Sequence, residues 1–77
     1  MTKSLHSEKH QRLCKLLVDA RENRGLTQIA VSKKLGRPQS FVSKYESGER
    51  RLDVLEFLEV AEALGVNPSR LISKLKG

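Results

Sequence analysis

Apolar residues recur along this chain at spacings of three and four, which place them on one face of a helix. Five such segments follow one another, and each of the first four ends at a glycine: Gly25, Gly36, Gly48 and Gly65. Glycine is common there because a chain that leaves a helix often needs φ > 0. No segment alternates with period two for long enough to indicate a strand. The pattern therefore predicts an all-α fold, a compact bundle of five helices.

The same spacing predicts which side chains face the core. The first helix begins near Ser7, and the inward positions of the first four helices form the predicted core. They are Leu13, Leu16, Leu17 and Ala20 in the first helix, Val31 and Leu35 in the second, Val42 and Tyr45 with Phe41 beside them in the third, and Leu55, Leu58, Ala61 and Leu64 in the fourth. The short fifth helix carries Leu71, Ile72 and Leu75.

Residues with capping chemistry mark the starts of the later helices. Thr27 can cap the second helix, and Pro38 suits the first turn of the third because its missing N–H would have no partner there. Asp53 and Glu56 have the spacing of a capping box at the start of the fourth helix. The Asn-Pro pair at 67–68 then begins the short fifth helix.

The charge of this 77-residue chain is unevenly distributed, although its net value is only +6. Residues 1–52 carry a net charge of +7, residues 53–65 carry −4, and residues 66–77 carry +3. This segregation indicates that one face approaches a polyanion, since an ordinary soluble surface mixes both signs throughout. Residues 1–6 are expected to form a flexible basic tail, and residues 7–77 a single domain.

Composition argues against several classes of protein. A lone Cys14 cannot form an internal disulfide, and no apolar run approaches the roughly 20 residues of a membrane span. A cytoplasmic protein without a membrane partner is therefore expected. His6, His10 and Cys14 recur every four residues, but ligands spread over two turns do not close easily around one ion, so neither metal nor cofactor is expected. No nucleophile–base set or phosphate loop stands out, and no enzyme activity is expected.

The stretch LTQIAVSKKLGRPQSFVSKYESG at residues 26–48 predicts two short helices that turn at Gly36. With Gln28 opening the first of them, small Ser32 at the helix crossing and LDVLEFLEVAEALGV following, it resembles the helix-turn-helix domain of the Cro, phage-repressor and XRE family of bacterial regulators. The resemblance extends from about residue 13 to residue 71 and implies a lambda-repressor-like DNA-binding fold. It also implies a sequence-specific transcriptional regulator, which binds a pseudo-palindromic operator in double-stranded DNA as a homodimer.

The resemblance assigns the outward side of the predicted third helix to the DNA bases, because this part of the motif enters the major groove. The expected base contacts are Gln39, Ser40, Ser43 and Lys44. Gln39 can pair with adenine through two hydrogen bonds, although its preference for this base depends on the neighbouring residues. Lys44 can donate a hydrogen bond to guanine. The expected phosphate contacts are Gln28, Lys33, Lys34, Arg37, Ser47, Arg50 and Arg51. The alternative for each is an ordinary solvated surface position.

The resemblance also implies two supporting interactions. Gln28 is expected to bond a phosphate and to support Gln39. Arg21 and Glu46 are expected to form a partly buried structural ion pair, so Glu46 belongs to the scaffold although it lies on the helix that faces DNA.

Two apolar residues depart from the family pattern. Phe41 replaces a commonly small residue, and either packs at the flank of the core or contacts thymine methyl groups. Ile29 stands where family members often carry glutamate, and either packs half-buried against the first helix or contacts a partner protein.

The last helix supplies candidates for a dimer interface, namely Leu71, Ile72 and Leu75, whose alternative role is to close the monomer core. A second hypothesis is a protein-interaction module of the same fold, such as an antitoxin that neutralises a toxin. Ile29 and the acidic fourth helix would then form its contact surface. The protein partners considered are accordingly polymerase, for a regulator, and a toxin.

Overall fold

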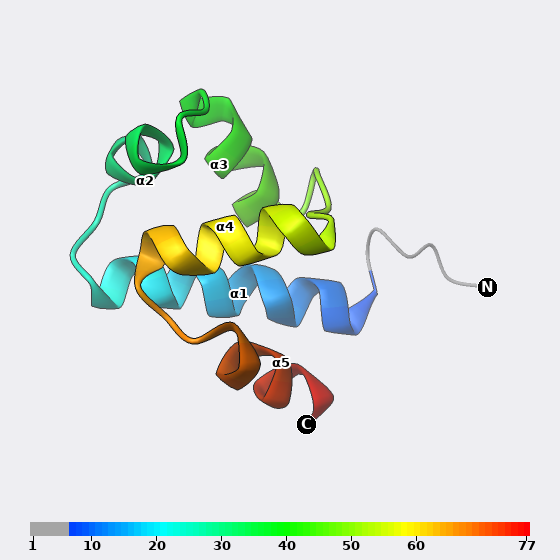
Figure 1. The fold of residues 1–77 in the computed structure, drawn as a ribbon. Coiled ribbons are helices and arrows are strands. Elements are labelled where there is room, and N and C mark those ends of the chain that lie inside the picture. The colour runs from blue at the N-terminus through cyan, green and yellow to red at the C-terminus, as the bar shows by residue number, and fades with distance from the viewer. Residues whose placement is uncertain (1–6) are drawn as a thin grey trace.

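The structure is a computed structural model that describes residues 7–77, within which there are five α-helices and no strand (Figure 1). The helices are α1 (Glu8–Asn23), α2 (Gln28–Leu35), α3 (Gln39–Ser47), α4 (Val54–Leu64) and α5 (Pro68–Lys76). The predicted all-α fold is confirmed for this part of the chain. The predicted basic tail, residues 1–6, lies outside the described residues.

Local capping chemistry determines where most of the helices begin. The side chain of Thr27 accepts a hydrogen bond from the Ala30 N–H, and Asp53 with Glu56 forms both bonds of a capping box, as predicted. The prediction that Pro38 lies in the first turn of α3 is wrong by one residue. Pro38 is the N-cap residue, with extended backbone and no side-chain capping bond, and the helix begins after it.

The turn between α2 and α3 depends on a glycine. Gly36 has φ 67° and ψ 32°, in the left-handed region that costs residues with a Cβ about 1–2 kcal/mol. Its N–H is bonded to carbonyls of the last turn of α2. The chain therefore reverses sharply enough for α3 to pack directly against α2.

The core forms where the inner faces of the helices meet. Its largest fully buried side chains are Leu17, Val31, Val42, Tyr45, Val60 and Leu64. α5 contributes Leu71, which is only 5% exposed and belongs to the same cluster. The assignment of Leu71 to a dimer interface is therefore wrong, because its side chain already closes the core of the protomer. Leu75 is partly buried, and Ile72 is 46% exposed.

The predicted inner face of α4 is half wrong. Leu55 and Leu58 are 71% and 44% exposed. The buried residues of α4 are Phe57, Val60, Ala61 and Leu64. Phe57 follows Leu55 by two positions, which turns a helix by about 200°, so burying one exposes the other. Leu55, Leu58 and Val54 thus lie on the solvent side of α4.

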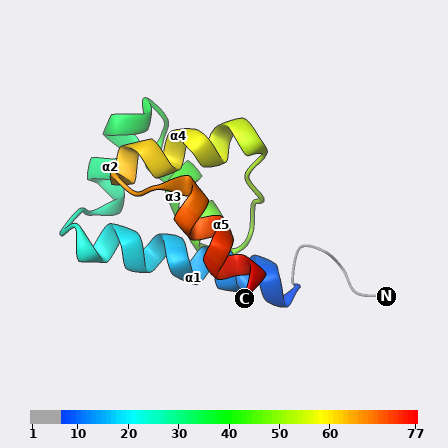
Figure 2. The ribbon, with the colours of Figure 1, turned by 60° about the horizontal axis from the view of Figure 1, so that its bottom comes forward.

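α1 and α4 lie between the α2–α3 pair and α5, and contact both. α2 and α3 pack against each other at one side of the molecule, with α2 also against α4 and α3 also against α1. α5 lies at the other side, where it packs on both α1 and α4 (Figure 2). No helix among residues 7–77 is long and apolar enough to cross a membrane. The arrangement leaves the outer side of α3 open to solvent.

Candidate nucleic-acid interface

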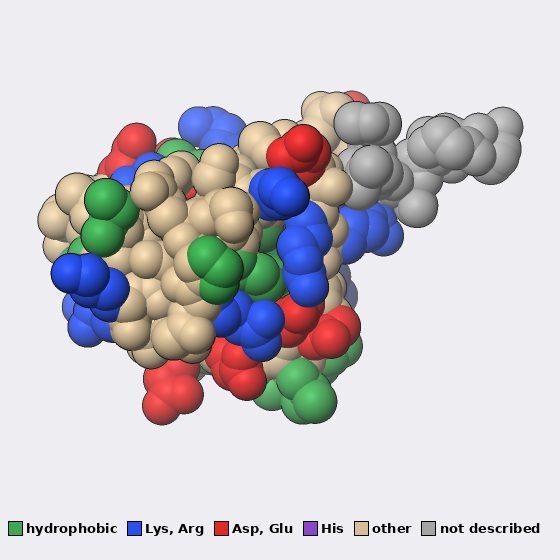
Figure 3. Space-filling view, turned by 90° about the horizontal axis from the view of Figure 1, so that it is seen from above, with side chains coloured by type: hydrophobic (Ala, Val, Ile, Leu, Met, Phe, Trp, Pro, Cys, Tyr) green, Lys and Arg blue, Asp and Glu red, His purple; other side chains and the backbone are tan. Residues whose placement is uncertain are grey.

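The outer side of α3 is polar and fully accessible. Its inner side is buried through Phe41, Val42 and Tyr45. The four predicted base contacts on the same helix are all exposed: Gln39, Ser40, Ser43 and Lys44. We call these four residues the reading face. Figure 3 looks onto α2 and α3, and shows a largely uncharged centre with Lys and Arg as well as Asp and Glu side chains around it.

A continuous chain of hydrogen bonds leads from α1 to the reading face. Arg21 Nε donates to Glu46 Oε2 at 2.7 Å, and Arg21 Nη2 donates to Glu46 Oε1 at 3.2 Å. Gln28 Nε2 donates to Glu46 Oε1 at 2.8 Å. Gln39 Nε2 in turn donates to Gln28 Oε1 at 3.2 Å. The expected ion pair is thus present, and Gln28 contacts Gln39 as the resemblance implied.

The ion pair is well shielded from solvent. The side chains of Arg21 and Glu46 are 14% and 6% exposed, and Arg21 Nη1 also donates to the carbonyl of Leu26 at 2.9 Å. The pKa of Arg21 is raised above its ordinary value, mainly because the hydrogen bond to Glu46 stabilises the charged form. Removing one partner of a fully buried pair costs about 3–5 kcal/mol because the other charge is left unpaired, and for this partly buried pair the expected cost is smaller. The pair therefore holds α3 firmly against α1.

Phe41 packs at the flank of the core, which is the first of its two predicted roles. It is 8% exposed, and its ring meets Tyr45 edge-on with centroids 5.6 Å apart. The guanidinium carbons of Arg37 and Arg50 lie over the same ring, 4.5 and 4.8 Å from its centroid. Such cation–π contacts hold flexible arginine side chains in place. Phe41 therefore positions two cations beside α3.

Glu56 binds both of these arginines. Arg50 donates to its two carboxylate oxygens at 2.9 and 2.8 Å, and Arg37 Nη1 lies 3.8 Å from Oε2. The hydrogen bond from Arg50, followed by that from the Asp53 N–H, lowers the pKa of Glu56 from 4.5 to about 2. A phosphate would have to compete with this carboxylate for Arg50, one of the predicted phosphate contacts.

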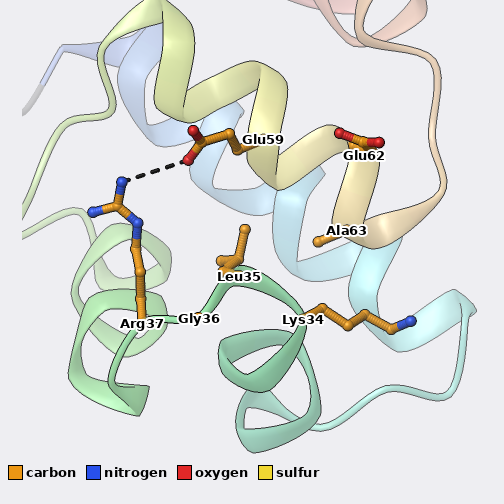
Figure 4. Close-up of a pocket in the computed structure, with 7 residues that line it drawn as sticks. All are labelled: Lys34, Leu35, Gly36, Arg37, Glu59, Glu62 and Ala63. Atoms are coloured by element: carbon orange, nitrogen blue, oxygen red, sulfur yellow. Dashed lines mark hydrogen bonds and ion pairs between the residues drawn. The ribbon is translucent and has the colours of Figure 1, made fainter.

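Arg37 and Lys34 line a hollow between α2 and α4 (Figure 4). Arg37 extends toward Glu59, with Nη2 3.5 Å from Oε1. Lys34 extends sideways, away from Arg37. The structure thus brings Arg37 to the edge of α3 but does not bring Lys34 to the same place.

The remaining predicted phosphate contacts lie on exposed segments. Lys33 on α2 and Arg51 after α3 are exposed. Ser47 is exposed too, but its hydroxyl donates to the Lys44 carbonyl at 3.2 Å and accepts from the Glu49 N–H at 3.3 Å. Ser47 therefore helps to end α3.

The sequence did not indicate the role of two residues that support α3. Glu56 was recognised only as a helix cap, although Arg50 lies six positions before it. His10 is 7% exposed, and its Nε2 lies 3.3 Å from the carbonyl oxygen of Gly48 at the end of α3. No local signal indicates a contact between positions this far apart. Between residues 7 and 77, no three His, Cys, Asp or Glu side chains form a group that could hold a metal, and His6 lies outside this range.

A family model described as helix-turn-helix matches residues 17–71, which include all of α2, α3 and α4. The chain belongs to the XRE-type helix-turn-helix family. An uncharacterised HTH-type transcriptional regulator of Sinorhizobium fredii, y4dJ, is 38% identical over 53 residues, which are 69% of each chain.

Two solved structures extend the XRE-type match. An XRE-family like protein from Pseudomonas syringae pv. tomato is 48% identical with a TM-score of 0.88, over 95% of this chain and 89% of that one. The restriction-modification controller C.AhdI of Aeromonas hydrophila is 26% identical with a TM-score of 0.78, over 84% and 98% of the respective chains. Both the family and the fold predicted from the sequence are confirmed.

Proposed function

We propose that this XRE-type protein is a sequence-specific transcriptional regulator, which binds a pseudo-palindromic DNA operator as a homodimer with α3 in the major groove. The reading face carries this proposal. Its four exposed polar side chains have no role in the core, whereas the opposite side of the same helix is buried. The major groove is about 12 Å wide and admits one helix, and hydroxyl, amide and ammonium groups match the polar edges of its bases.

Cationic and polar groups beside the reading face support phosphate binding. Lys33, Arg37 and Arg51 lie on α2 or on the segments that flank α3, and Gln28 lies beside Gln39. Contacts of this kind set the position of a protein on the duplex without reading its sequence. Lys34 is a weaker candidate because it extends away from Arg37. Arg50 is weaker because its hydrogen bonds to Glu56, at 2.9 and 2.8 Å, are shorter than the contacts of Arg37 with Glu56 at 3.8 Å and Glu59 at 3.5 Å.

Exposed apolar residues on α4 and α5 support dimerisation. They are Val54, Leu55 and Leu58 on α4 and Ile72 on α5, and we call them the α4–α5 apolar surface. α4 and α5 pack against each other, so these residues belong to adjoining elements. A homodimer that binds two half-sites one turn of DNA apart has to hold its two copies of α3 about 34–36 Å from each other.

The test compares wild type, Lys44→Ala and Lys74→Ala on a duplex selected from a randomised pool. Lys44 lies on the reading face, whereas Lys74 is an exposed cation on α5 at the other side of the molecule. We expect Lys44→Ala to weaken binding by about tenfold and Lys74→Ala to leave it nearly unchanged. Wild-type affinity should also fall steeply between 50 and 200 mM salt, because phosphate contacts release counterions. Salt-independent binding would contradict the proposal.

A protein-interaction module remains the second candidate function, favoured by one observation. Ile29 on α2 is 51% exposed and makes no capping or core contribution. An antitoxin of this fold could use it to bind a toxin. Ile29→Ser separates the two functions, because it should leave the affinity for DNA unchanged while weakening any partner complex that depends on this side chain.

A further inference from the structure

We infer that a groove between α1 and α5 is a binding site for a small organic anion, in which an apolar body carries an acidic group. The groove lies along the C-terminal half of α1, where α5 packs on it (Figure 2), and residues 65–67 between α4 and α5 line it too. Its volume of 460 Å³ falls in the range of about 300–1,000 Å³ that is usual for small-molecule sites. None of its residues is a predicted DNA contact, so the inference does not depend on the proposed function.

The floor of the groove is apolar. Leu71 of α5 is buried, and Leu16, Ala20 and Val66 are partly buried where they pack against the core. All four residues line the groove. A ligand with an apolar body would remove this surface from water, which is favourable.

The rim of the groove is cationic. Its exposed polar side chains are three cations and two amides, namely Arg24, Arg70, Lys74, Asn23 and Asn67. No Asp or Glu among residues 7–77 lines the groove, and no ion pair in this range includes any of the three cations. The hollow between α2 and α4 differs, because two glutamates line it beside its two cations (Figure 4). Positive charge that the protein does not neutralise itself favours an anionic ligand.

Arg24 is held in place at this rim. Its Nη2 donates a hydrogen bond to the carbonyl oxygen of Gly65, just after α4. The guanidinium occupies space that only a glycine leaves free, since a Cβ on residue 65 would lie 2.9 Å from Nη2 and 3.2 Å from Nη1. This bond uses one of the five N–H donors of arginine, and the others can bind two oxygens of a carboxylate or phosphate. Because the guanidinium is already positioned, less side-chain entropy is lost when the anion binds.

The arrangement also determines how a ligand would be oriented. Arg70 and Lys74 are one turn apart on α5 and lie on the same side of that helix, whereas Leu71 beside them faces the core. The acidic group of a ligand can therefore lie among the cations at the rim while its apolar body covers the floor. An uncharged apolar compound would lack the first contact, and a bare anion would lack the second.

The test titrates the full chain, without DNA, with octanoate and with phenyl phosphate, and follows the backbone amides by ¹⁵N–¹H NMR. 1-Octanol supplies an apolar chain without the charge, and acetate supplies a charge without the chain. We expect at least one of the two acids to bind with a Kd below about 1 mM and to move the signals of residues 16–24 and 65–74. 1-Octanol and acetate should each bind about tenfold more weakly or less.

Two variants place the ligand in the groove. Arg70→Gln removes a cation of the rim, and Lys76→Gln is the matched control, because Lys76 is an exposed cation on the same helix that does not line the groove. We expect Arg70→Gln to weaken binding about fivefold and Lys76→Gln to leave it nearly unchanged. Lys74→Gln carries the same expectation as Arg70→Gln and decides if circular dichroism shows that Arg70→Gln does not fold.

Three results would overturn the inference. Neither acid binds saturably at millimolar concentration, or the signals move mainly at the α4–α5 apolar surface, or the rim variants and Lys76→Gln weaken binding equally. The last result would indicate a general attraction to the positive charge of the protein. The proposed function fails by a different measurement, when the wild type shows no salt-dependent binding to any duplex.

Discussion

Tyr45 is almost completely buried on α3, yet it carries a polar atom that makes no hydrogen bond within the described residues. The residue is 2% exposed, and its hydroxyl has no hydrogen-bond partner among residues 7–77. Burial raises the pKa of this phenol above its ordinary value, with the nearby charge of Glu46 as a further cause. The hydroxyl therefore stays neutral and adds nothing to the bonds that hold α3 in place.

Tyr45→Phe is accordingly expected to keep or raise the stability of the fold. A buried polar group without a partner costs about 1–3 kcal/mol, so removing it should leave the free energy of unfolding unchanged or increase it by about 1 kcal/mol. Urea unfolding followed by circular dichroism measures the difference. A loss greater than 1 kcal/mol would show that the hydroxyl does make a stabilising bond.

Single residues could be predicted from the sequence where the decisive neighbours are close in the chain. Thr27 and the Asp53–Glu56 box cap their helices as predicted, because capping acts over three residues. The Arg21–Glu46 pair spans 25 positions and came only from the family resemblance. The contact of His10 with Gly48 spans 38 positions, and no pattern along the chain indicates it.

Among the elements, α4 shows that hydrophobic periodicity alone does not always predict which face of a helix is buried. Apart from its three glutamates, all its residues are apolar, so a stripe through Leu55 and a stripe through Phe57 fit the sequence almost equally well. Packing against α2 and α5 selects the second stripe. The spacing therefore predicted the existence and start of the helix correctly, but its rotation depends on neighbours that the local pattern does not contain.

The start of α4 gives a prediction of pH dependence. The folded-state pKa of Glu56, about 2, lies below its ordinary value of 4.5, so its carboxylate stabilises the fold fully above pH 4.5. This contribution is lost as the pH falls from 4.5 toward 2. Glu56→Gln should therefore lower the free energy of unfolding by about 1 kcal/mol at pH 7, through the lost cap and ion pair, and by much less near pH 2.

Glu59→Gln is the matched control for this measurement. Glu59 lies one turn further along α4 and is 56% exposed, with an ion pair to Arg37 at 3.5 Å. Exposed pairs of this kind contribute about 0–1 kcal/mol, so the control should show little change at either pH. An equal pH dependence in both variants would contradict the special role of Glu56.

In the whole molecule, two kinds of surface lie on different helices. The exposed polar residues of the reading face lie on α3, whereas the residues of the α4–α5 apolar surface lie on α4 and α5. The sequence indicated this separation through the uneven distribution of charge. It did not indicate that Leu71 is buried in the protomer core or that Val54 is exposed, because both depend on how α4 and α5 pack.

Leu55→Ser tests the proposed dimer. Leu55 is 71% exposed in the protomer, so the substitution should leave the helical content unchanged while weakening dimerisation by at least tenfold. Sedimentation equilibrium across a range of concentrations measures the change. Ile29→Ser removes an exposed apolar side chain of α2 and should leave dimerisation intact. A monomeric wild type, or equal effects of both variants, would exclude this surface.

Arg21 belongs to α1, yet it anchors the carboxylate on which the polar contacts of Gln28 and Gln39 depend. An engineer who transplants only residues 26–48 onto a foreign scaffold would move the two-helix unit without its anchor. Such a chimera should still adhere to duplexes through its lysines and arginines, yet tolerate substitutions in the target site that the intact parent rejects. Including the first helix in the graft should restore the discrimination.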